Sequence, residues 1–452
     1  MINRNADVLW LVEHVARELD AACIVKAMLE SRFQISVQIC QLNRDYKIAT
    51  RLMSPRLVVF PFFYRRSDPG VKPYCDAWPE ARFMNLAWEE LFYGANSDFK
   101  RPADDFARQS VHFHAWGDFY KEYLLQSSVD PAHIFVNGNP AFQLYFKPYR
   151  RYFKTREQIA AENGLDPTRR WILIPENYRW AFIPDESIED LRGRNADTDE
   201  ISRLRIYCRK ALRELIQWCA EAAKAGDFEL ILRPRPATTL AEFQAFAAEV
   251  VNLLPGNMHI IQSDSVREWI LASDVVMSSY STTLIEAALV EKPIFMVETL
   301  PVPASLTCDW HSLIECITTK KEFLEVCASK KAQEKIQEEV PEKTIDDLLG
   351  NFVELKEWAC RSMLDHGDVF EGLATYVAGL VKEGPTVQAQ SNHSAIKFTN
   401  NLNTSGLKIT IKAALKEFKR KLLRQQTHSI GFADDFKQNE VDLKVRRWSQ
   451  FL

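Results

Sequence analysis

The stretch SDVVMSSYSTTLIEAALVEKPIFM, residues 273–296, holds the pattern that decides the fold class. A short apolar run comes first, a cluster of hydroxyl side chains follows, and apolar residues at helical spacing then lead into a second apolar run. This succession predicts a buried strand, a turn, a helix and another strand, the unit from which parallel α/β sheets are built. Ligands bind at the carboxyl ends of strands in such sheets, so the hydroxyl cluster marks a candidate ligand site.

The same alternation of apolar runs and helical spacing recurs on both sides of this stretch. We expect two Rossmann-like, doubly wound α/β domains, at residues 1–146 and 171–383, joined by the charged connection 147–170. The strand candidates of the first domain are DVLWLV (7–12), SVQICQL (36–42), RLVVFPFF (56–63), ARFMNLAW (81–88), SVHFHAWG (110–117) and HIFVNGNP (133–140). Those of the second domain, besides the opening stretch, are WILIPEN (171–177), FELILRPRP (228–236) and MHIIQ (258–262).

The composition is that of an ordinary globular protein. Of the 452 residues, 46% are hydrophobic and 26% are charged, and the net charge of −4 provides no general attraction to nucleic acid. The nine cysteines include no C-x-x-C pair, which favours reduced thiols in a cytoplasmic protein over a disulfide framework or a zinc module. No signal-peptide pattern opens the chain, and no run approaches the roughly 20 apolar residues of a membrane span. We therefore expect a cytoplasmic protein, with attachment to a membrane surface left open.

The hydroxyl cluster suits a phosphate group. The first turn of a helix has unpaired N–H groups and the positive end of the helix dipole, and both favour phosphate. Ser279, Ser281, Thr282 and Thr283 can add hydroxyl donors at this turn. The alternative is structural, because Glu286 stands three residues after Thr283 and the pair matches a helix-capping box.

Two arginines strengthen the phosphate interpretation. Arg233 and Arg235, in RPRP at 233–236, end a strand that we expect to neighbour the hydroxyl cluster. A guanidinium offers a planar fork that matches phosphate or carboxylate oxygens. The alternative is a solvated pair of charges at the end of a strand.

An ordered series of motifs resembles one known family. The motifs are VEHVARELDAACIVKAML, MNLAWEELFYGAN, AWGDFYKEYL, IFVNGNPAFQLY, ILIPENYRWAF, ILRPRP and SSYSTTLIEAALVEKPIF, and they span roughly residues 8–383. In this order they resemble bacterial surface-carbohydrate and capsule polysaccharide biosynthesis proteins, some of which are similar to transferases of the sugar acid Kdo. One departure stands out: the family has R-P-H-P where this chain has R-P-R-P. Arg235 replaces the histidine, and a permanent cation cannot serve as an acid or base near neutral pH.

The resemblance implies the GT-B architecture, two Rossmann-like domains that face each other across a cleft. Glu13 follows the first strand and Glu89 follows FMNLAW, so both carboxylates would face that cleft. Either one can deprotonate an acceptor hydroxyl or attack the anomeric carbon of a donor sugar. His14, Glu176 and Asn177 would line the same cleft.

Structural roles compete with these assignments. Arg17 stands four residues after Glu13 and next to Glu18, so Glu13 can equally form an ion pair on the first helix, and such an ion pair is the favoured role of Glu18. Glu286, if it is not a cap, can accept hydrogen bonds from ribose, as a similarly placed glutamate does in many GT-B enzymes.

The resemblance implies a glycosyltransferase of surface polysaccharide assembly that takes a nucleotide-activated sugar. CMP-Kdo is the leading donor, because one phosphate and one carboxylate would match two arginines, although the diphosphate of a UDP-hexose suits the same groups. The acceptor would be a growing or lipid-linked glycan. Three other roles remain open: a nucleotide-sugar epimerase, a polyol-phosphate transferase and a non-catalytic assembly protein.

We expect neither a metal nor another cofactor. DTD at 197–199 has the D-x-D form of metal-dependent transferases, but it lies in a polar segment and is best explained as a solvated acidic loop. His112 and His114 alternate on one strand face, and no third ligand stands near them in sequence, which favours packing over metal binding.

The end of the chain suggests where the protein works. Residues 384–406 have the polar composition of a linker, and residues 407–452 form a predicted tail. Within the tail, residues 407–424 place apolar residues at helical spacing among seven cations and one anion. This is the pattern of a basic amphipathic helix, which can lie on an anionic membrane surface or pack on the protein body.

We predict that this segment docks the protein on the inner face of a bacterial membrane. Each cation near an anionic leaflet contributes about 1 kcal/mol, and salt screens the effect. The full-length protein should therefore sediment with anionic liposomes at low salt and be released as salt is added. A chain cut after residue 400 should stay folded and lose this binding. No sedimentation at low salt would show that the helix is a packing element.

Overall fold

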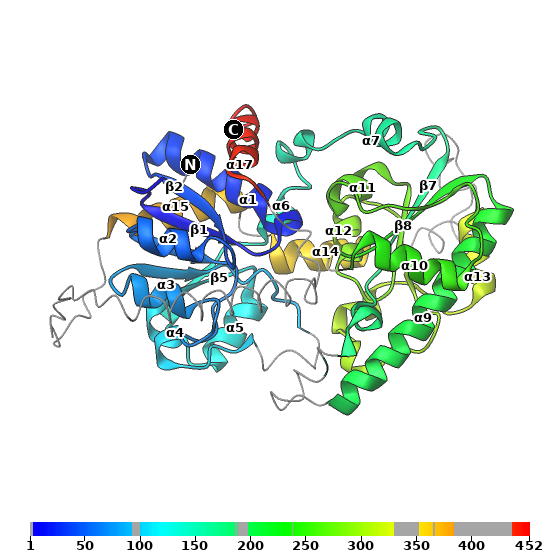
Figure 1. The fold of residues 1–452 in the computed structure, drawn as a ribbon, viewed down its shortest axis with the longest axis horizontal. Coiled ribbons are helices and arrows are strands. Elements are labelled where there is room, and N and C mark those ends of the chain that lie inside the picture. Colours follow the sequence, from blue (N-terminus) through cyan, green and yellow to red (C-terminus); the bar gives the residue numbers. More distant parts are fainter. Residues whose placement is uncertain are drawn as a thin grey trace, which may run out of the picture.

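The computed structural model describes residues 3–92, 100–185, 188, 198–236, 238–329, 352–364, 367–383 and 436–452. Two six-stranded parallel sheets form two domains that lie side by side (Figure 1). The predicted class of two doubly wound α/β domains is confirmed.

The first domain contains the sheet of order β2-β1-β3-β4-β5-β6. Strand β1 is buried along its whole length. This is expected for a parallel sheet that helices cover on both faces. The strands are β1 (Val8–Val12), β2 (Val37–Gln41), β3 (Leu57–Phe60), β4 (Arg82–Asn85), β5 (Val111–Ala115) and β6 (Ile134–Val136). The helices between them are α1 (Val15–Met28), α2 (Tyr46–Leu52), α3 (Lys72–Ala77), α4 (Asp105–Ser110) and α5 (Asp118–Gln126), and α6 (Pro140–Gln143) follows the last strand.

The second domain repeats this design with the order β12-β11-β10-β7-β8-β9. The stretch 273–296 forms β10, α12 and most of β11, as its pattern predicts. The strands are β7 (Arg170–Pro175), β8 (Phe228–Arg233), β9 (Met258–Ile260), β10 (Val275–Ser278), β11 (Ile294–Val297) and β12 (Cys316–Ile317). The helices are α7 (Arg156–Asn163), α9 (Thr198–Ala225), α10 (Leu240–Val250), α11 (Val266–Ala272), α12 (Thr283–Leu289) and α13 (Lys320–Ala328). Asp199 of the DTD motif thus lies in the first turn of α9 rather than in a loop.

Two later helices cross from the second domain back to the first. Helix α14 (Phe352–Met363) packs against α12, and α15 (Val369–Lys382) packs against α1 and α6. The end of α14 approaches the first domain closely, because a Cβ atom on Gly117 would lie 1.8 Å from the carbonyl oxygen of Ser362. Helix α15, the last helix of the predicted second domain 171–383, thus packs its apolar face against the first domain.

The last described helix, α17 (Gln438–Trp448), also lies against α1 (Figure 1). The indole of Trp448 is fully buried and stacks on Tyr152 of the interdomain connection, with ring centroids 3.8 Å apart and planes 7° apart. Arg447 donates a hydrogen bond of 2.6 Å to the carbonyl of Tyr152. A cut after residue 400 would remove this packing as well, so the expectation that such a chain stays folded conflicts with the structure.

The predicted membrane segment 407–424 and the linker 384–406 lie outside the described residues. The membrane role of residues 407–424 stays a prediction. Replacing the seven cations of this segment by glutamine tests it without removing α17. Among the described residues, no helix is both long enough and apolar enough to cross a membrane.

A buried carboxylate joins three parts of the chain. Asp20 of α1 accepts hydrogen bonds from Lys444 Nζ at 2.7 Å and from Trp448 Nε1 at 3.3 Å, both on α17. Arg267 of α11, in the second domain, places its Nη1 3.9 Å from the same carboxylate. These cations outweigh the effect of burial and hold the pKa of Asp20 below its usual value.

The two histidines of β5 make contacts within the first domain. His112 Nδ1 lies 2.9 Å from the hydroxyl of Tyr376 on α15, and His114 Nε2 lies 3.4 Å from the amide nitrogen of Asn137. Burial lowers the pKa of each imidazole to about 4, so both are neutral at physiological pH.

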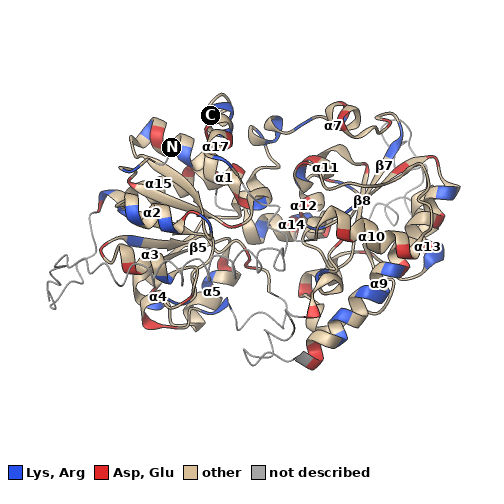
Figure 2. Cartoon of the chain, viewed as in Figure 1, with Lys and Arg blue, Asp and Glu red and all other residues tan. Residues whose placement is uncertain are grey.

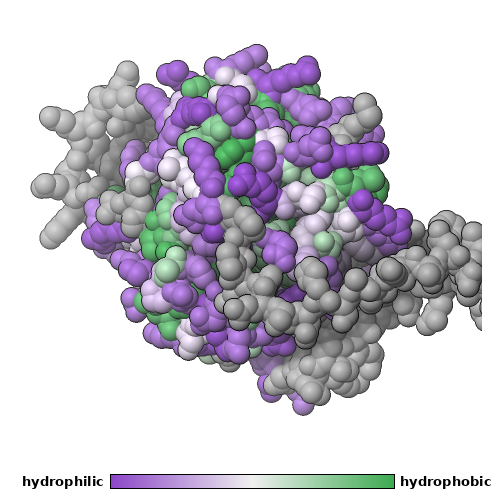
Figure 3. All heavy atoms as spheres, turned by 90° about the vertical axis from the view of Figure 1, so that its left-hand side faces the viewer, coloured by the Kyte–Doolittle hydropathy of each residue, from purple (hydrophilic) through white to green (hydrophobic). Residues whose placement is uncertain are grey.

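Charged residues lie mostly on the helices and loops of both domains, whereas the strands consist mainly of other residues (Figure 2). On the face of the first domain that is turned away from the second, hydrophobic residues form small separate patches among hydrophilic ones (Figure 3). Small apolar patches of this kind are normal on a protein surface.

We predict that Asp20→Ala lowers the free energy of unfolding by about 3–5 kcal/mol, because Lys444 and Arg267 would then lack their buried anion. Chemical denaturation followed by circular dichroism measures the change. The matched control is Asp442→Ala, an exposed aspartate on α17, which should alter stability by less than about 0.5 kcal/mol. Equal stability of the two variants would contradict the role assigned to Asp20.

Candidate functional site

The carboxyl edge of the first sheet carries a cluster of acidic residues around one arginine. Glu13 directly follows β1 and Glu89 follows β4. Arg17 of α1 places one terminal nitrogen 2.8 Å from Glu89 and the other 2.8 Å from Glu18. The same second nitrogen lies 3.9 Å from Glu13. The structure thus brings the two predicted catalytic carboxylates into one charge network.

The network gives these two carboxyl groups opposite tendencies to ionise. Desolvation and the nearby negative charges of Glu18 and Glu89 raise the pKa of Glu13, and the neighbouring cations only partly offset this. Desolvation acts on Glu89 too, but the charges of Arg17 and Lys100 outweigh it and hold the pKa of Glu89 far below its usual value. Glu13 is therefore the better proton acceptor near neutral pH, whereas Glu89 is a permanent anion.

One member of this cluster was not predicted from the sequence. Lys100 Nζ lies 2.6 Å from Glu89, and no sequence signal marked it. Glu18, fully buried, forms the ion pair with Arg17 that the sequence favoured, and it also accepts the backbone N–H of Glu13 at 2.8 Å. His14 lies 3.8 Å from Glu13, as expected for a residue at this edge.

The carboxyl edge of the second sheet is held together by Glu176. One of its oxygens accepts the backbone N–H of Arg235 at 3.0 Å, and the other accepts that of Tyr178 at 2.7 Å. The amide of Asn177 donates to the carbonyl of Tyr280 at 3.2 Å. These bonds connect the loops that follow β7, β8 and β10. Glu176 therefore holds the loops in position, and both of its oxygens are occupied.

The two predicted donor-binding arginines lie in different environments. Arg233 is buried and donates to the backbone carbonyls of Ser263 and Asp264, at 2.6 Å each. Burial lowers its pKa to about 10, and its terminal donors hold the loop before α11. The guanidinium of Arg235 is half-buried and makes no hydrogen bond or ion pair with the residues described. Of the two, Arg235 is the one whose donors are open to an anion.

The side chains of the hydroxyl cluster also differ in whether they have hydrogen-bond partners. Ser278 donates to the carbonyl of Pro175, and Thr283 donates to Ser281 at 2.9 Å. Ser279 is 2% exposed, and its hydroxyl has no partner in the part of the chain that is described. Thr282 precedes α12 without a side-chain capping bond.

The capping box considered for Thr283 and Glu286 does not form. Glu286 instead accepts a hydrogen bond of 2.6 Å from the hydroxyl of Tyr145, just after α6 at the end of the first domain. Desolvation raises the pKa of Glu286, and Arg267 acts in the opposite direction. Glu286 therefore links the second domain to the first.

Arg179 is a further cation that sequence reasoning missed. It opens the short 3-10 helix η5 (Arg179–Phe182), directly after the β7 loop. Desolvation and the charge of Arg235 lower its pKa, and Glu89 of the first domain opposes them. Arg179 thus lies within electrostatic range of both carboxyl edges. Its position in PENYRW, just past a strand end, was the available signal.

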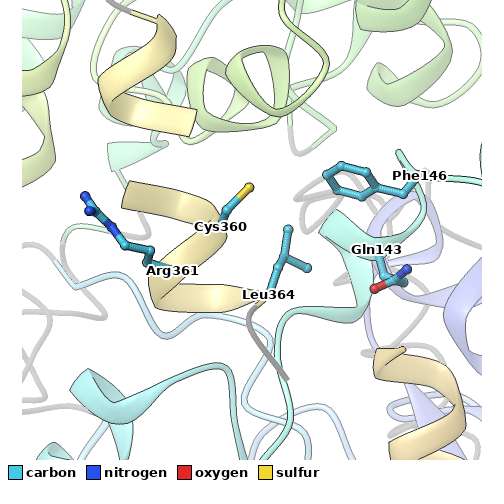
Figure 4. Close-up of a pocket in the computed structure, with 5 residues that line it drawn as sticks. All are labelled: Gln143, Phe146, Cys360, Arg361 and Leu364. Atoms are coloured by element: carbon cyan, nitrogen blue, oxygen red, sulfur yellow. The ribbon is translucent and has the colours of Figure 1, made fainter. Parts of the chain in front are cut away.

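A pocket of about 290 Å³ lies between the end of the first domain, at α6 and Phe146, and the end of α14 (Figure 4). Phe146, Cys360 and Leu364 turn toward its interior, and Gln143 and Arg361 complete the lining. None of the site residues predicted from the sequence belongs to this lining.

The comparisons with known proteins concern the fold. No protein-family model matches the chain, and no curated protein sequence matches it. The structure of the wall teichoic acid polymerase TagF is similar with a TM-score of 0.50 at 10% identity, over 83% of this chain and 88% of that one. Staphylococcus aureus MnaA with UDP follows at a TM-score of 0.46 and 13% identity, over 85% and 99%. Anabaena Alr3699/HepE, in complex with UDP and glucose, has a TM-score of 0.42 and 11% identity, over 83% and 100%. With two parallel six-stranded sheets and returning C-terminal helices, the chain has the GT-B fold.

Proposed function

We propose that this protein is a glycosyltransferase that moves a sugar from a nucleotide-activated donor to a glycan of the bacterial surface. The observation that carries the proposal is the pairing of two chemically opposite carboxyl edges. The first edge holds the carboxylates of Glu13 and Glu89. The second holds the guanidiniums of Arg179 and Arg235, neither of which makes a hydrogen bond or ion pair with the residues that the structure describes. Such a division suits a base for the acceptor on one domain and cations for the donor on the other.

The donor site comprises Arg179, Arg235 and the hydroxyl of Ser279. The two guanidiniums match two anionic groups of a donor. The buried hydroxyl of Ser279, which has no partner among the described residues, can supply one more hydrogen bond. CMP-Kdo, with one phosphate and one carboxylate, fits this set and is our leading donor. The resemblance of the sequence motifs to surface-carbohydrate biosynthesis proteins supports this choice.

In the reaction we propose, Glu13 takes the proton of the acceptor hydroxyl. The acceptor oxygen then forms a bond to the anomeric carbon, and the bond from that carbon to the donor phosphate breaks. The bonding electrons leave with the nucleotide, whose added negative charge Arg179 and Arg235 stabilise. Glu89 stays ionised and keeps Arg17 in place beside Glu13.

The acceptor we propose is a growing or lipid-linked glycan. The basic segment 407–424 would bring the enzyme to the membrane surface where a lipid-linked acceptor lies.

The donor assignment predicts that Arg179→Gln and Arg235→Gln each weaken nucleotide binding by about ten- to a hundredfold, because each removes a charged hydrogen-bond donor. Isothermal titration against CMP, CDP, UDP and GDP measures the affinities and identifies the nucleotide. Arg203→Gln, at an exposed arginine on α9, is the matched control and should bind as the wild type does. Wild-type affinity in the Arg179, Arg235 double variant would refute the donor site.

The catalytic assignment predicts that Glu13→Gln abolishes donor turnover while nucleotide affinity is unchanged, because the glutamine cannot accept a proton. Glu89→Gln should keep some activity and shift the acid limb of the pH–rate profile to lower pH. Its negative charge raises the pKa of Glu13, so removing that charge lowers the pKa.

Release of nucleotide from a sugar donor, followed across pH, measures both effects. An unshifted acid limb in Glu89→Gln, or normal turnover in Glu13→Gln, would place the base elsewhere.

A further inference from the structure

The two domains meet along a seam that neither the donor site nor the catalytic cluster uses. On the second domain it is formed by the 3-10 helix η7 (Asp309–Leu313) and the preceding Cys308, whose thiol donates to the carbonyl of Phe92 at 3.5 Å. Helix α14 contacts η7 and also closes on Gly117 of the first domain. We call these contacts, together with Trp88, Glu90 and Trp116, the domain seam.

Five buried polar atoms of the domain seam have no hydrogen-bond partner among the described residues. They are Trp88 Nε1, Glu90 Oε1, Trp116 Nε1, Trp310 Nε1 and His311 Nε2. Their residues are between 1% and 6% exposed. A buried polar group without a partner is costly, and native proteins supply one from protein, water or ligand.

The chemistry of these atoms points to one kind of partner. An indole N–H can only donate. His311 Nδ1 accepts the backbone N–H of Cys308 at 3.3 Å, so Nε2 carries the proton and also donates. Burial lowers the pKa of His311 to about 4, which keeps the imidazole neutral.

Glu90 also has an unpaired oxygen. One of its oxygens accepts the backbone N–H of Trp116 at 2.8 Å, and the other has no partner among the described residues. Burial raises the pKa of Glu90 well above its usual value, which favours the protonated form that can donate a hydrogen bond. Among the described residues, the domain seam thus offers indole and imidazole N–H donors that have no acceptors.

We propose that the domain seam is a saccharide subsite for the acceptor, whose hydroxyl and ring oxygens accept from Trp88, Trp116, His311 and Glu90 when the two domains part. Aromatic rings and hydrogen-bond donors suit the apolar faces and the oxygen rim of a sugar ring. Trp88 and Glu90 flank Glu89, so a sugar here would lie beside the proposed catalytic cluster. This inference rests on the proposed function.

The test removes single N–H groups and keeps aromatic rings in place. Trp88→Phe and Trp116→Phe delete a donor of the domain seam, and Trp10→Phe is the matched control. Trp10 is also fully buried with an indole N–H that has no partner among the described residues, but it lies in the middle of β1. All three variants lose the same group and a similar volume, so their melting temperatures should change alike.

Saturation-transfer NMR with glucose and glucuronic acid, a neutral and an acidic probe, measures saccharide binding to the full-length protein. Each seam variant should bind about three- to tenfold more weakly, as expected for one neutral hydrogen bond. The Trp10 variant should bind as the wild type does. In the unmodified protein, the saccharide should shift the indole N–H resonances of Trp88 and Trp116 and leave that of Trp10 in place.

Absence of binding by both probes, or equal loss in all three variants, would overturn the subsite and leave buried water as the partner of these donors. Nucleotide titration of the same proteins separates the two proposals. Normal nucleotide affinity without saccharide binding refutes the subsite alone, whereas saccharide binding without nucleotide affinity refutes the donor assignment.

Discussion

The buried carboxylate of Asp20 is the interaction on which the arrangement of the two domains depends. A charge in this position is unfavourable unless Lys444, Trp448 and Arg267 are all present, and these residues come from the far end of the chain and from the second domain. The interdomain connection lies among them, with Tyr152 stacked on Trp448 and Arg267 over the ring of Phe153. The geometry between the domains is thus coupled to the C-terminal helix.

Polar residues at the strand ends divide into those that hold loops and those with open donors. Glu176 and Arg233 direct all or most of their hydrogen-bonding groups to backbone atoms, and they fix the loops around them. The guanidinium of Arg235, two residues after Arg233, makes no hydrogen bond or ion pair with the described residues. A rigid set of loops that presents a few open donors is what preorganised binding of an anion requires.

A similar division applies to the carboxylates of the first domain. Arg17 stabilises the ionised form of Glu89, while Glu13 remains far enough from its cations for desolvation to dominate. Two neighbouring carboxyl groups beside the same guanidinium therefore differ in pKa. This difference allows one of them to act as a base and the other as a fixed negative charge.

The sequence by itself determined the fold class and the edges at which the site residues lie. Short apolar runs alternating with helical spacing require parallel strands covered by helices, and turn-rich strand ends place Glu13, Glu89, Arg235 and Ser279 at carboxyl edges. A local sequence pattern can predict these features because the spacing of buried apolar side chains follows the period of the strand or helix that contains them. Only the tertiary structure decided which polar groups pair. Arg233 and Glu286 form hydrogen bonds to other groups of the protein, whereas Arg179 and the donors of the domain seam have no hydrogen-bond partner in the part of the chain that the structure describes. The return of α15 and α17 to the first domain was equally invisible, since such contacts join residues hundreds of positions apart and depend on distances and burial that sequence spacing does not encode.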